Sequence, residues 1–432
     1  MTEIDEAGLP TPASIQRIYF TLLLGNTLAA SFIWGINTIF LLDAGLSNLE
    51  AFAANAFFTV GMVLFEVPTG IVADTIGRRV SYLLGTVTLA ATTLLYVLLW
   101  QIEGPFWAWA VVSILLGLGF TFFSGAVEAW LVDALHATHF EGNLESVFGR
   151  GQVVAGVAML TGSVAGGYIA QITNLGVPFV LRAVVLGVMF VLAFLLMKDV
   201  GFTPQERIGV KRGVQRIAGA SIEYGWRVPA VKWIMLASPF TAGVGFYAFY
   251  ALQPYLLELW GNSEAYGIAG LVAAIVAGAQ IVGGIAAPVI RRMFHRRTSA
   301  LLITAFLSAV TLVLIGVFEQ FWAAVALIVI WGLLFAATMP IRQAYLNGLI
   351  PSQQRATILS FDSMLGSSGG VVIQPVLGRS ADVWGYPGSY VLGGLISALA
   401  LPFIFLSRRE NAPADTAGGE AEAPLAALES EI

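Results

Sequence analysis

The sequence contains no cysteine and little charge. Charged residues make up 11% of its 432 residues, against about 25% in an ordinary soluble domain. The missing thiols exclude disulfides and thiolate metal sites. The scarcity of charge, together with 58% hydrophobic residues and a mean hydropathy of +0.83, excludes a soluble domain. The chain is therefore predicted to be an integral membrane protein.

Several functional motifs are also missing. No GxxxxGK[ST] loop is present, so ATP use is not expected and an ion gradient is the expected driving force. His136, His139 and His295 are the three histidines, and all fall in predicted cytoplasmic loops without further ligands. We therefore expect no metal site and no cofactor. No Ser/His/Asp arrangement suggests an enzyme.

Long apolar runs of about 20 residues, the length of a helical membrane span, recur along the chain. The sequence predicts an all-α membrane protein with twelve spans at 19–42, 49–72, 80–100, 107–133, 147–172, 177–197, 232–259, 266–290, 298–318, 321–349, 356–381 and 389–406.

Basic residues set the orientation. The loops at 43–48, 101–106, 173–176, 260–265, 319–320 and 382–388 contain no Lys or Arg, whereas the loops after spans 2, 6, 8 and 10 hold most of them. The positive-inside rule then places both termini in the cytoplasm. Arg182 and Arg379, near the outer ends of spans 6 and 11, go against this trend.

The spans divide the chain into two halves around one long loop. We expect a cytoplasmic tail (1–18), a first six-helix bundle (19–197), a cytoplasmic linker (198–231), a second bundle (232–406) and a disordered acidic tail (407–432). The linker has apolar residues among basic ones. It is either a helix lying on an anionic leaflet or a plain tether.

Glycines recur in register near the ends of four spans. Gly70 and Gly284 fall on the cytoplasmic side, and Gly167 and Gly378 on the outer side. Three-span repeats in inverted orientation, duplicated once, would leave this pattern. The alternative is that each glycine only allows close helix packing.

The loop between spans 2 and 3 carries the most specific motif. Its pattern, Gly70-x3-Asp74-x2-Gly77-Arg78-Arg79, resembles the signature loop of the major facilitator superfamily. Together with the span count, the resemblance covers Arg17 to Arg409. It implies a fold of two six-helix bundles with inverted three-helix repeats.

The resemblance also implies a conformational latch. Asp74 would face the N-terminus of a helix from the opposite half, where the helix dipole favours an anion. Arg78 would pair with Asp133 at the cytoplasmic end of span 4. Gly70, Gly77 and Arg79 would complete this latch. The alternative is that Arg78 and Arg79 only set the topology.

Two further stretches bear on the subtype. GIAAPVIRRMFHRR, the equivalent loop of the second half, keeps Gly284 but has Pro288 where the acid would be. GSVAGG in span 5, from Gly162 to Gly167, resembles the antiporter motif of bacterial drug:proton exporters, with Ser163 in place of its proline.

Carboxyl groups inside the spans are candidates for proton coupling, because desolvation favours their protonated form. Glu128 in span 4 is the first candidate, and a static pair with Arg150 is the alternative. Glu66 in span 2 competes for the same role. Arg342 and Asp362 are expected to pair as a gate in the second half, either as a structural ion pair or by contacting a substrate.

Polar and aromatic residues at helical spacing mark faces that either line a water-filled path or pack between helices. The predicted substrate-cavity residues are Asn26, Asn37, Thr121, Ser124, Phe246, Tyr247, Tyr250, Gln253, Trp331 and Thr338. The aromatic members would suit a flat amphipathic substrate.

These features together predict a secondary active transporter of the inner (plasma) membrane. Proton-coupled export of a small amphipathic or drug-like compound by alternating access is the favoured activity. Proton-coupled uptake of a nutrient or organic anion is one alternative, and a non-transporting receptor or lipid-handling protein is the other. The expected partners are a small-molecule substrate and membrane lipids but no nucleic acid, and the expected state is a monomer.

Overall fold

The computed structural model describes residues 10–123, 125–204, 219, 226–350 and 355–416. Nearly all of these residues are helical, and among them the only β-type pairing is one isolated bridge between Arg296 and Thr416. The predicted all-α class is therefore confirmed.

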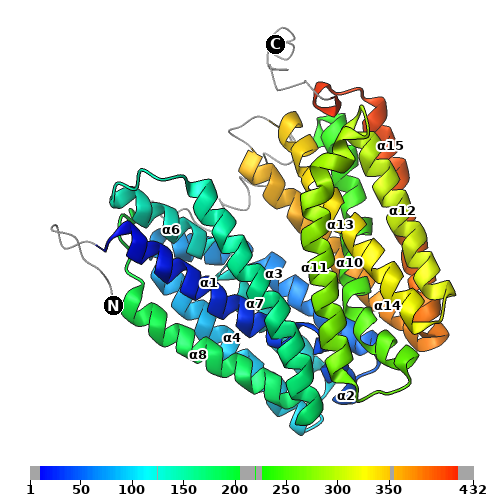
Figure 1. Ribbon diagram of the computed structural model, residues 1–432, viewed down its shortest axis with the longest axis horizontal. Helices are drawn as coiled ribbons and strands as arrows, with labels where there is room; N and C mark the ends of the chain where they lie inside the picture. The colour runs from blue at the N-terminus through cyan, green and yellow to red at the C-terminus, as the bar shows by residue number, and fades with distance from the viewer. Residues whose placement is uncertain (1–9, 124, 205–218, 220–225, 351–354, 417–432) are drawn as a thin grey trace. The chain divides into compact units, whose positions relative to one another are not determined.

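The helices form two groups, one before and one after the central linker in the sequence (Figure 1). Before it come α1 (Pro12–Trp34), α2 (Asn37–Asp43), α3 (Asn48–Thr75), α4 (Arg78–Gln101), α5 (Phe106–Thr121), α6 (Ala126–Ala137), α7 (Leu144–Ile172) and α8 (Gly176–Leu196). After it come α10 (Pro229–Trp260), α11 (Tyr266–Arg292), α12 (Arg297–Val317), α13 (Phe321–Leu349), α14 (Arg355–Ala398), α15 (Ala400–Arg409) and the 3-10 turn η3 (Pro413–Asp415).

The helix count agrees with twelve membrane crossings. Among the described residues, ten helical segments are long and apolar enough to span a bilayer, or eleven when α1 and α2, bent by 46°, count as one. The last segment, Ile358–Arg409, has 52 residues, about twice the length that one crossing needs. Gly385, with a φ of 69°, breaks it into two crossings.

Local sequence signals explain where particular helices begin. Ser47 and Glu50 form a capping box at the start of α3, with the Ser47 side chain accepting from the Glu50 N–H, which satisfies backbone donors that a helix start leaves unpaired. Span 4 is broken into α5 and α6 by Gly125, whose φ of 69° is left-handed. Glycine adopts this conformation without a Cβ clash.

The helices pack into two compact units whose boundary differs from the predicted one. The first unit contains the helices before the linker together with Tyr250–Gly278, and the second contains the remainder of α10 and of the chain after it. A close glycine contact explains the grouping: a Cβ on Gly167 in α7 would lie 2.5 Å from the Tyr266 carbonyl oxygen in α11. The outer part of α10 and the first part of α11 therefore belong to the core of the first unit.

Equivalent helix pairs in the two units cross at glycine. A Cβ on Gly61 in α3 would collide with the backbone of Ile114 in α5, and one on Gly283 in α11 with the backbone of Leu333 in α13. By contrast, a Cβ on Gly70 or Gly284 would meet nothing within 4 Å. The tight packing expected at these two cytoplasmic helix ends is thus absent from this conformation.

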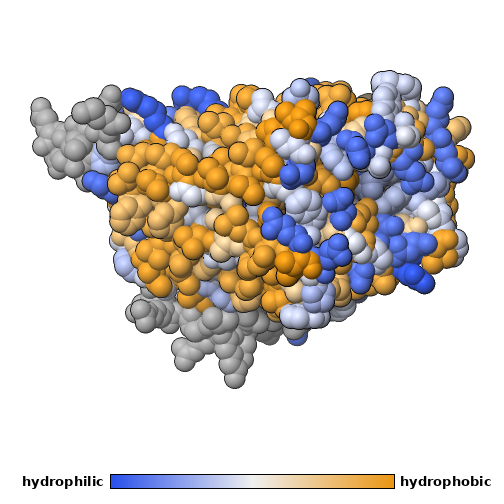
Figure 2. Space-filling view, turned by 90° about the horizontal axis from the view of Figure 1, so that it is seen from below, coloured by the Kyte–Doolittle hydropathy of each residue, from blue (hydrophilic) through white to orange (hydrophobic). Residues whose placement is uncertain are grey.

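One side of α8 is suited to contact lipid. Val180, Val184, Val188 and Val191, spaced three or four residues apart, are each at least 41% exposed. Figure 1 shows α4 and α8 side by side, and Figure 2 shows a broad apolar area on the side of the molecule where α8 lies.

The C-terminal tail begins later than predicted. α15 continues to Arg409, and η3 packs beyond it with Asp415 only 2% exposed. Residues 407–416 are therefore ordered, contrary to our expectation, because Asp415 is held by hydrogen bonds to the start of α12. The amphipathic stretch of the linker (205–218 and 220–225) and residues 417–432 lie outside the described residues.

Candidate functional site

Arg78 lies between two acids at the predicted cytoplasmic end of the first unit. One of its guanidinium nitrogens is 2.5 Å from Asp74 Oδ1, and its Nε is 3.8 Å from Asp133 Oδ2. Arg78 itself is 16% exposed, and the two acids are 39% and 35% exposed. The structure thus brings the predicted latch residues together, with the closer contact made inside the motif itself.

Asp199, which the sequence reasoning did not select, caps the helix that follows the motif. Its Oδ1 accepts a hydrogen bond of 2.9 Å from the Arg79 N–H, and its Oδ2 lies against Gly77, where a side chain would collide. Gly77 has a φ of 136°, which favours glycine. Burial raises the pKa of Asp199, and the hydrogen bond and charge of Arg79 and the charge of Arg78 partly offset this. Its sequence signal is an acid directly after span 6 in a basic loop.

The segment around Asp199 also holds the helix that carries Asp133. The Trp130 indole N–H donates to the Lys198 carbonyl at 2.7 Å, and a Cβ on Gly201 would lie 2.6 Å from the Asp133 carbonyl oxygen. The chain that follows α8 therefore contacts α4, which carries Arg78 and Arg79, and α6, which carries Asp133.

Glu128 lies in α6, the second part of the broken span 4. It is exposed, and it has no hydrogen bond or ion pair with any described residue. Arg150, the proposed static partner, is also exposed and donates instead to the backbone of α7. Glu66 is partly buried in α3 and has interactions of its own. Ser124, at the break in span 4, lies outside the described residues.

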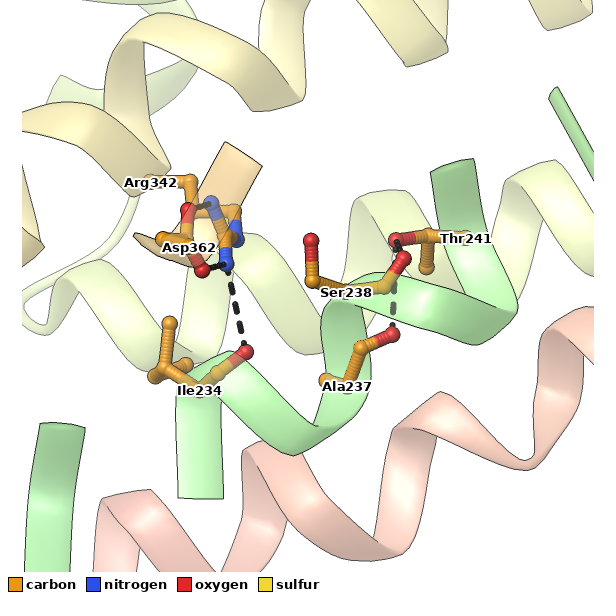
Figure 3. Close-up of polar contacts among 6 residues, drawn as sticks. All are labelled: Ile234, Ala237, Ser238, Thr241, Arg342 and Asp362. Atoms are coloured by element: carbon orange, nitrogen blue, oxygen red, sulfur yellow. Dashed lines mark hydrogen bonds and ion pairs between the residues drawn. The ribbon is translucent and has the colours of Figure 1, made fainter. Parts of the chain in front are cut away.

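Arg342 and Asp362 form a buried bidentate ion pair in the second unit (Figure 3). Two guanidinium nitrogens of Arg342 each donate to one Asp362 oxygen at 2.5 Å, and one of them also donates to the Ile234 carbonyl at 3.3 Å. The side chains are 14% and 8% exposed. The pair joins α13, α14 and α10, so the structure places the two predicted gate residues in direct contact.

A small cavity of about 40 Å³ lies beside this pair, inside the second unit. Trp331 and Phe335, with ring centroids 5.4 Å apart, line one part of it. Its other lining residues include the hydroxyl side chains of Thr241, Ser308, Thr338 and Ser397. This volume holds roughly three water molecules. Trp331 and Thr338, predicted to face substrate, therefore border a space for water.

The predicted aromatic wall of α10 is only partly accessible. Phe246 is 40% exposed, but Tyr247 is 1% exposed and donates a hydrogen bond to Ser389. Tyr247 is therefore a packing residue of the second unit, and its assignment to a substrate cavity is wrong for this conformation. Tyr250 is partly buried and belongs to the first unit.

Gln253 is fully buried and serves the break in span 1. Its amide N–H donates to the Trp34 carbonyl at 2.8 Å, and its amide oxygen accepts from the Thr38 N–H at 2.9 Å. The bend between α1 and α2 removes the intrahelical partners of such groups, and unpaired backbone groups are costly in a membrane. The Gln253 side chain thus takes the place of the missing intrahelical partners, and its assignment to the substrate cavity is also wrong here.

Asn26 and Asn37, among the remaining predicted cavity residues of the first unit, make contacts between helices. Asn26 accepts a hydrogen bond of 2.8 Å from the Tyr82 hydroxyl, and Asn37 donates one of 3.0 Å to Asn55. Thr121 is 3% exposed. The contacts of Asn26 and Asn37 match the packing alternative, whereas the Thr121 hydroxyl donates within its own helix to the Leu118 carbonyl at 2.9 Å.

The antiporter-like stretch of α7 is a packing surface. A Cβ on Gly162 would lie 2.5 Å from the Ser31 side chain, and one on Gly166 would collide with the backbone of Phe32. Gly167 meets the start of α11, as described above. The stretch therefore seats α7 against α1 and α11. Among the described residues no group of three His, Asp or Glu side chains lies close enough to hold a metal ion.

The family can be decided by comparison with known proteins. A model of the Major Facilitator Superfamily matches residues 18–372 and again 235–431. The chain belongs to the major facilitator superfamily. No curated protein matches its sequence.

Solved structures share the fold of this superfamily member. The nucleoside transporter NupG matches with a TM-score of 0.75 at 10% identity, covering 91% of this chain and 98% of NupG. The xylose transporter XylE from E. coli in an inward open conformation has a TM-score of 0.65 at 17% identity, covering 91% and 95%. A bacterial homolog of the human lysosomal transporter Spinster reaches 0.70 at 15% identity, covering 94% and 99%. The protein is a multi-pass membrane protein and a secondary transporter.

Proposed function

We propose that this transporter exports a small amphipathic compound in exchange for protons. It would act as a monomer in the cytoplasmic membrane, with the proton gradient as its energy source and no cofactor. The observation that carries the proposal is Glu128, a carboxyl inside a membrane span with no partner among the described residues.

Glu128 and Asp362 differ in what neutralises them. Asp362 is held by both arms of Arg342, so its charge is compensated whatever its access to water. Glu128 has no cation beside it among the described residues, so its charged form relies on access to water. When alternating access closes the path to water, the charged form of such a carboxyl is desolvated, and proton uptake accompanies closure.

The latch residues supply a two-state element for this cycle. Arg78 has two acids within 4 Å, and the contact with Asp74 is shorter than the contact with Asp133 by 1.3 Å (3.8 minus 2.5 Å). A shift of the arginine between these acids needs only a small movement at the ends of α3 and α6. We propose that this exchange accompanies opening and closing of the cytoplasmic side.

Export is supported by the similarity of Gly162–Gly167 to the antiporter motif, and an amphipathic cargo by the exposed Phe246. A transport assay tests both the direction and the cargo. The purified protein would be reconstituted in liposomes that contain a pH-sensitive dye. Lipophilic cations, tetracycline- and phenicol-like drugs, sugars and small organic anions would then be added singly under an imposed proton gradient.

We expect an amphipathic compound to release protons through the wild-type protein, and Glu128→Gln to abolish this release. Glu141→Gln is the matched control, because Glu141 is an exposed acid in the cytoplasmic loop between α6 and α7. Proton movement only with a sugar would contradict export and indicate uptake. Unchanged coupling in Glu128→Gln would exclude Glu128 as the proton carrier, and no proton movement with any compound would favour the receptor alternative.

A further inference from the structure

Arg182 is a cation on the wrong side of the membrane for setting topology. It lies six residues after the start of α8, or about 9 Å along the helix axis at 1.5 Å per residue. The predicted outer loops contain no Lys or Arg, so the positive-inside rule gives no reason for a base at this depth.

The side chain is on the inner face of α8. Phe179 and Leu186, at i−3 and i+4 from Arg182, are 1% and 2% exposed and belong to the core of the first unit. Phe179 stacks on Phe40 of α2, with ring centroids 4.0 Å apart. The lipid-facing side of the same helix carries Val180 and Val184. Arg182 therefore does not lie on the lipid-facing side of α8.

No acid among the described residues compensates this arginine. Its Nε is inaccessible to solvent and has no hydrogen-bond partner, and it forms no ion pair with any described residue. The groups that act on its charge are the phenols of Tyr250 and Tyr96. Asp43, near the same end of the unit, is bound by the Trp100 indole N–H at 2.8 Å.

A largely buried guanidinium with unused N–H donors destabilises the fold unless a ligand accepts its hydrogen bonds. A guanidinium has five N–H donors and no acceptor, and leaving a buried charge unpaired is strongly unfavourable. The residue as a whole is partly exposed, so the core does not enclose it completely. An arginine inside a membrane protein with its donors unused is best completed by an anion.

The two neighbouring phenols differ in what they offer. Ser113 donates to the Trp109 carbonyl at 2.7 Å, so in the short contact between Tyr96 and Ser113 the Tyr96 hydroxyl is the donor. Tyr96 therefore has no hydrogen left for a ligand. Tyr250 is partly buried and is the other phenol that acts on the charge of Arg182.

We propose that Arg182 binds the carboxylate or phosphate group of a small amphipathic anion, with Tyr250 beside it. That this anion is the exported compound rests on the proposed function. The binding site itself is argued from the position of Arg182 and does not depend on export. Export suits such a cargo, because an inside-negative membrane potential drives an anion outward. A phospholipid headgroup offers the same chemistry and is the other source to be distinguished.

The test is equilibrium binding to the protein in phosphatidylcholine nanodiscs, without any gradient. Each probe is an aromatic carboxylate or phosphate ester paired with its uncharged amide or alcohol, and binding is followed by calorimetry. We expect the wild-type protein to bind anions at least tenfold more tightly than their neutral partners. Arg182→Gln should remove this preference, Arg182→Lys should keep part of it, and Tyr250→Phe should weaken it.

Arg379→Gln is the matched control, because Arg379 is an exposed arginine near the outer end of the other outlying span. It should bind anions as the wild type does. Binding of the neutral partners by Arg182→Gln at wild-type affinity would show that this variant is folded. An anion preference that survives Arg182→Gln, or no anion preference across the whole panel, would overturn the proposal.

A second arm identifies the source of the anion. Nanodiscs containing phosphatidylglycerol should leave solute binding unchanged if the site serves a solute. Competition by phosphatidylglycerol that is lost in Arg182→Gln would assign the same site to a lipid phosphate. The binding assay is independent of proton exchange. Anion binding without proton movement would overturn only the exporter, and proton exchange without anion preference would overturn only this site.

Discussion

The two halves of the chain differently arrange the charges at the predicted cytoplasmic ends of their helices. In the first half, Arg78 contacts Asp74 and Asp133, and all three side chains are partly exposed. The equivalent loop of the second half has Pro288 at the place of the acid. The second half has another arginine–carboxylate pair, Arg342–Asp362, which lies inside the second unit and is bidentate. Exposed pairs exchange partners at little cost, whereas a buried pair does not. The first half therefore has the rearrangeable charges, and the second half has a fixed one.

In both halves, nevertheless, an acid that follows the last span caps the start of another helix. Asp199 follows span 6 and accepts from the N-terminal turn of α4, which is span 3. Asp415 follows span 12 and accepts from the Thr298 N–H at 2.7 Å and the Thr298 hydroxyl at 2.8 Å, at the start of α12, which is span 9. The cap is thus kept in both copies of the repeat, although the acid of the loop motif is present only in the first.

The largest effect is expected from breaking the buried pair. Removing one partner of a buried ion pair costs about 3–5 kcal/mol, so Asp362→Asn should lower the free energy of unfolding by this amount. Asp74→Asn, in the exposed pair, should cost less than about 1 kcal/mol. Denaturant unfolding of the purified protein in mild detergent measures both.

The double variant Arg342→Met/Asp362→Leu is the control for the buried pair. It removes both charges, so it should recover most of the stability that Asp362→Asn loses. Equal losses for Asp362→Asn and Asp74→Asn would contradict the contrast drawn between the two halves.

A smaller effect is expected from the motif glycines. Gly77→Ala should destabilise the protein by about 1–3 kcal/mol, because Gly77 has a positive φ and faces the Asp199 carboxylate. A Cβ at Gly70 would have no atom within 4 Å. Gly70→Ala should therefore leave the free energy of unfolding unchanged or raise it by about 1 kcal/mol.

Transport separates these glycine variants further. If the latch closes around Gly70 in another conformation, Gly70→Ala should slow proton-coupled flux in liposomes despite normal stability. Wild-type flux in this variant would argue that Gly70 has no role in the latch.

The smallest effects are expected from the two caps. Asp199→Ala and Asp415→Ala should each cost about 0.5–2 kcal/mol, the usual range for a lost helix cap. Only Asp199→Ala should also slow transport, because Asp199 holds the loop that carries Arg78. Unfolding and flux measured on the same preparations would test this, and equal slowing in both variants would speak against a role limited to the first half.

Much of the fold was predictable from the sequence for physical reasons. A bilayer demands about 20 apolar residues per crossing, so the hydropathy pattern predicts the spans. The distribution of basic residues among the loops predicts their orientation. The motif placed Arg78 near Asp133, and the spacing of Arg342 and Asp362 at the ends of adjacent spans suggested their pairing. Which face of α10 is buried was not predictable, because Tyr247 and Gln253 have the same periodicity whether they meet water or another helix.

The sequence by itself determined the helical class, the span count and the residues that carry charge into the membrane. The tertiary structure alone decided which of those charges are compensated. Arg342 has its acid, Glu128 and Arg182 have none among the described residues, and Asp199 caps a helix 120 positions earlier in the chain. The reason is that burial and pairing depend on helices far apart in the sequence, and a residue's own neighbours do not show which helix it will meet.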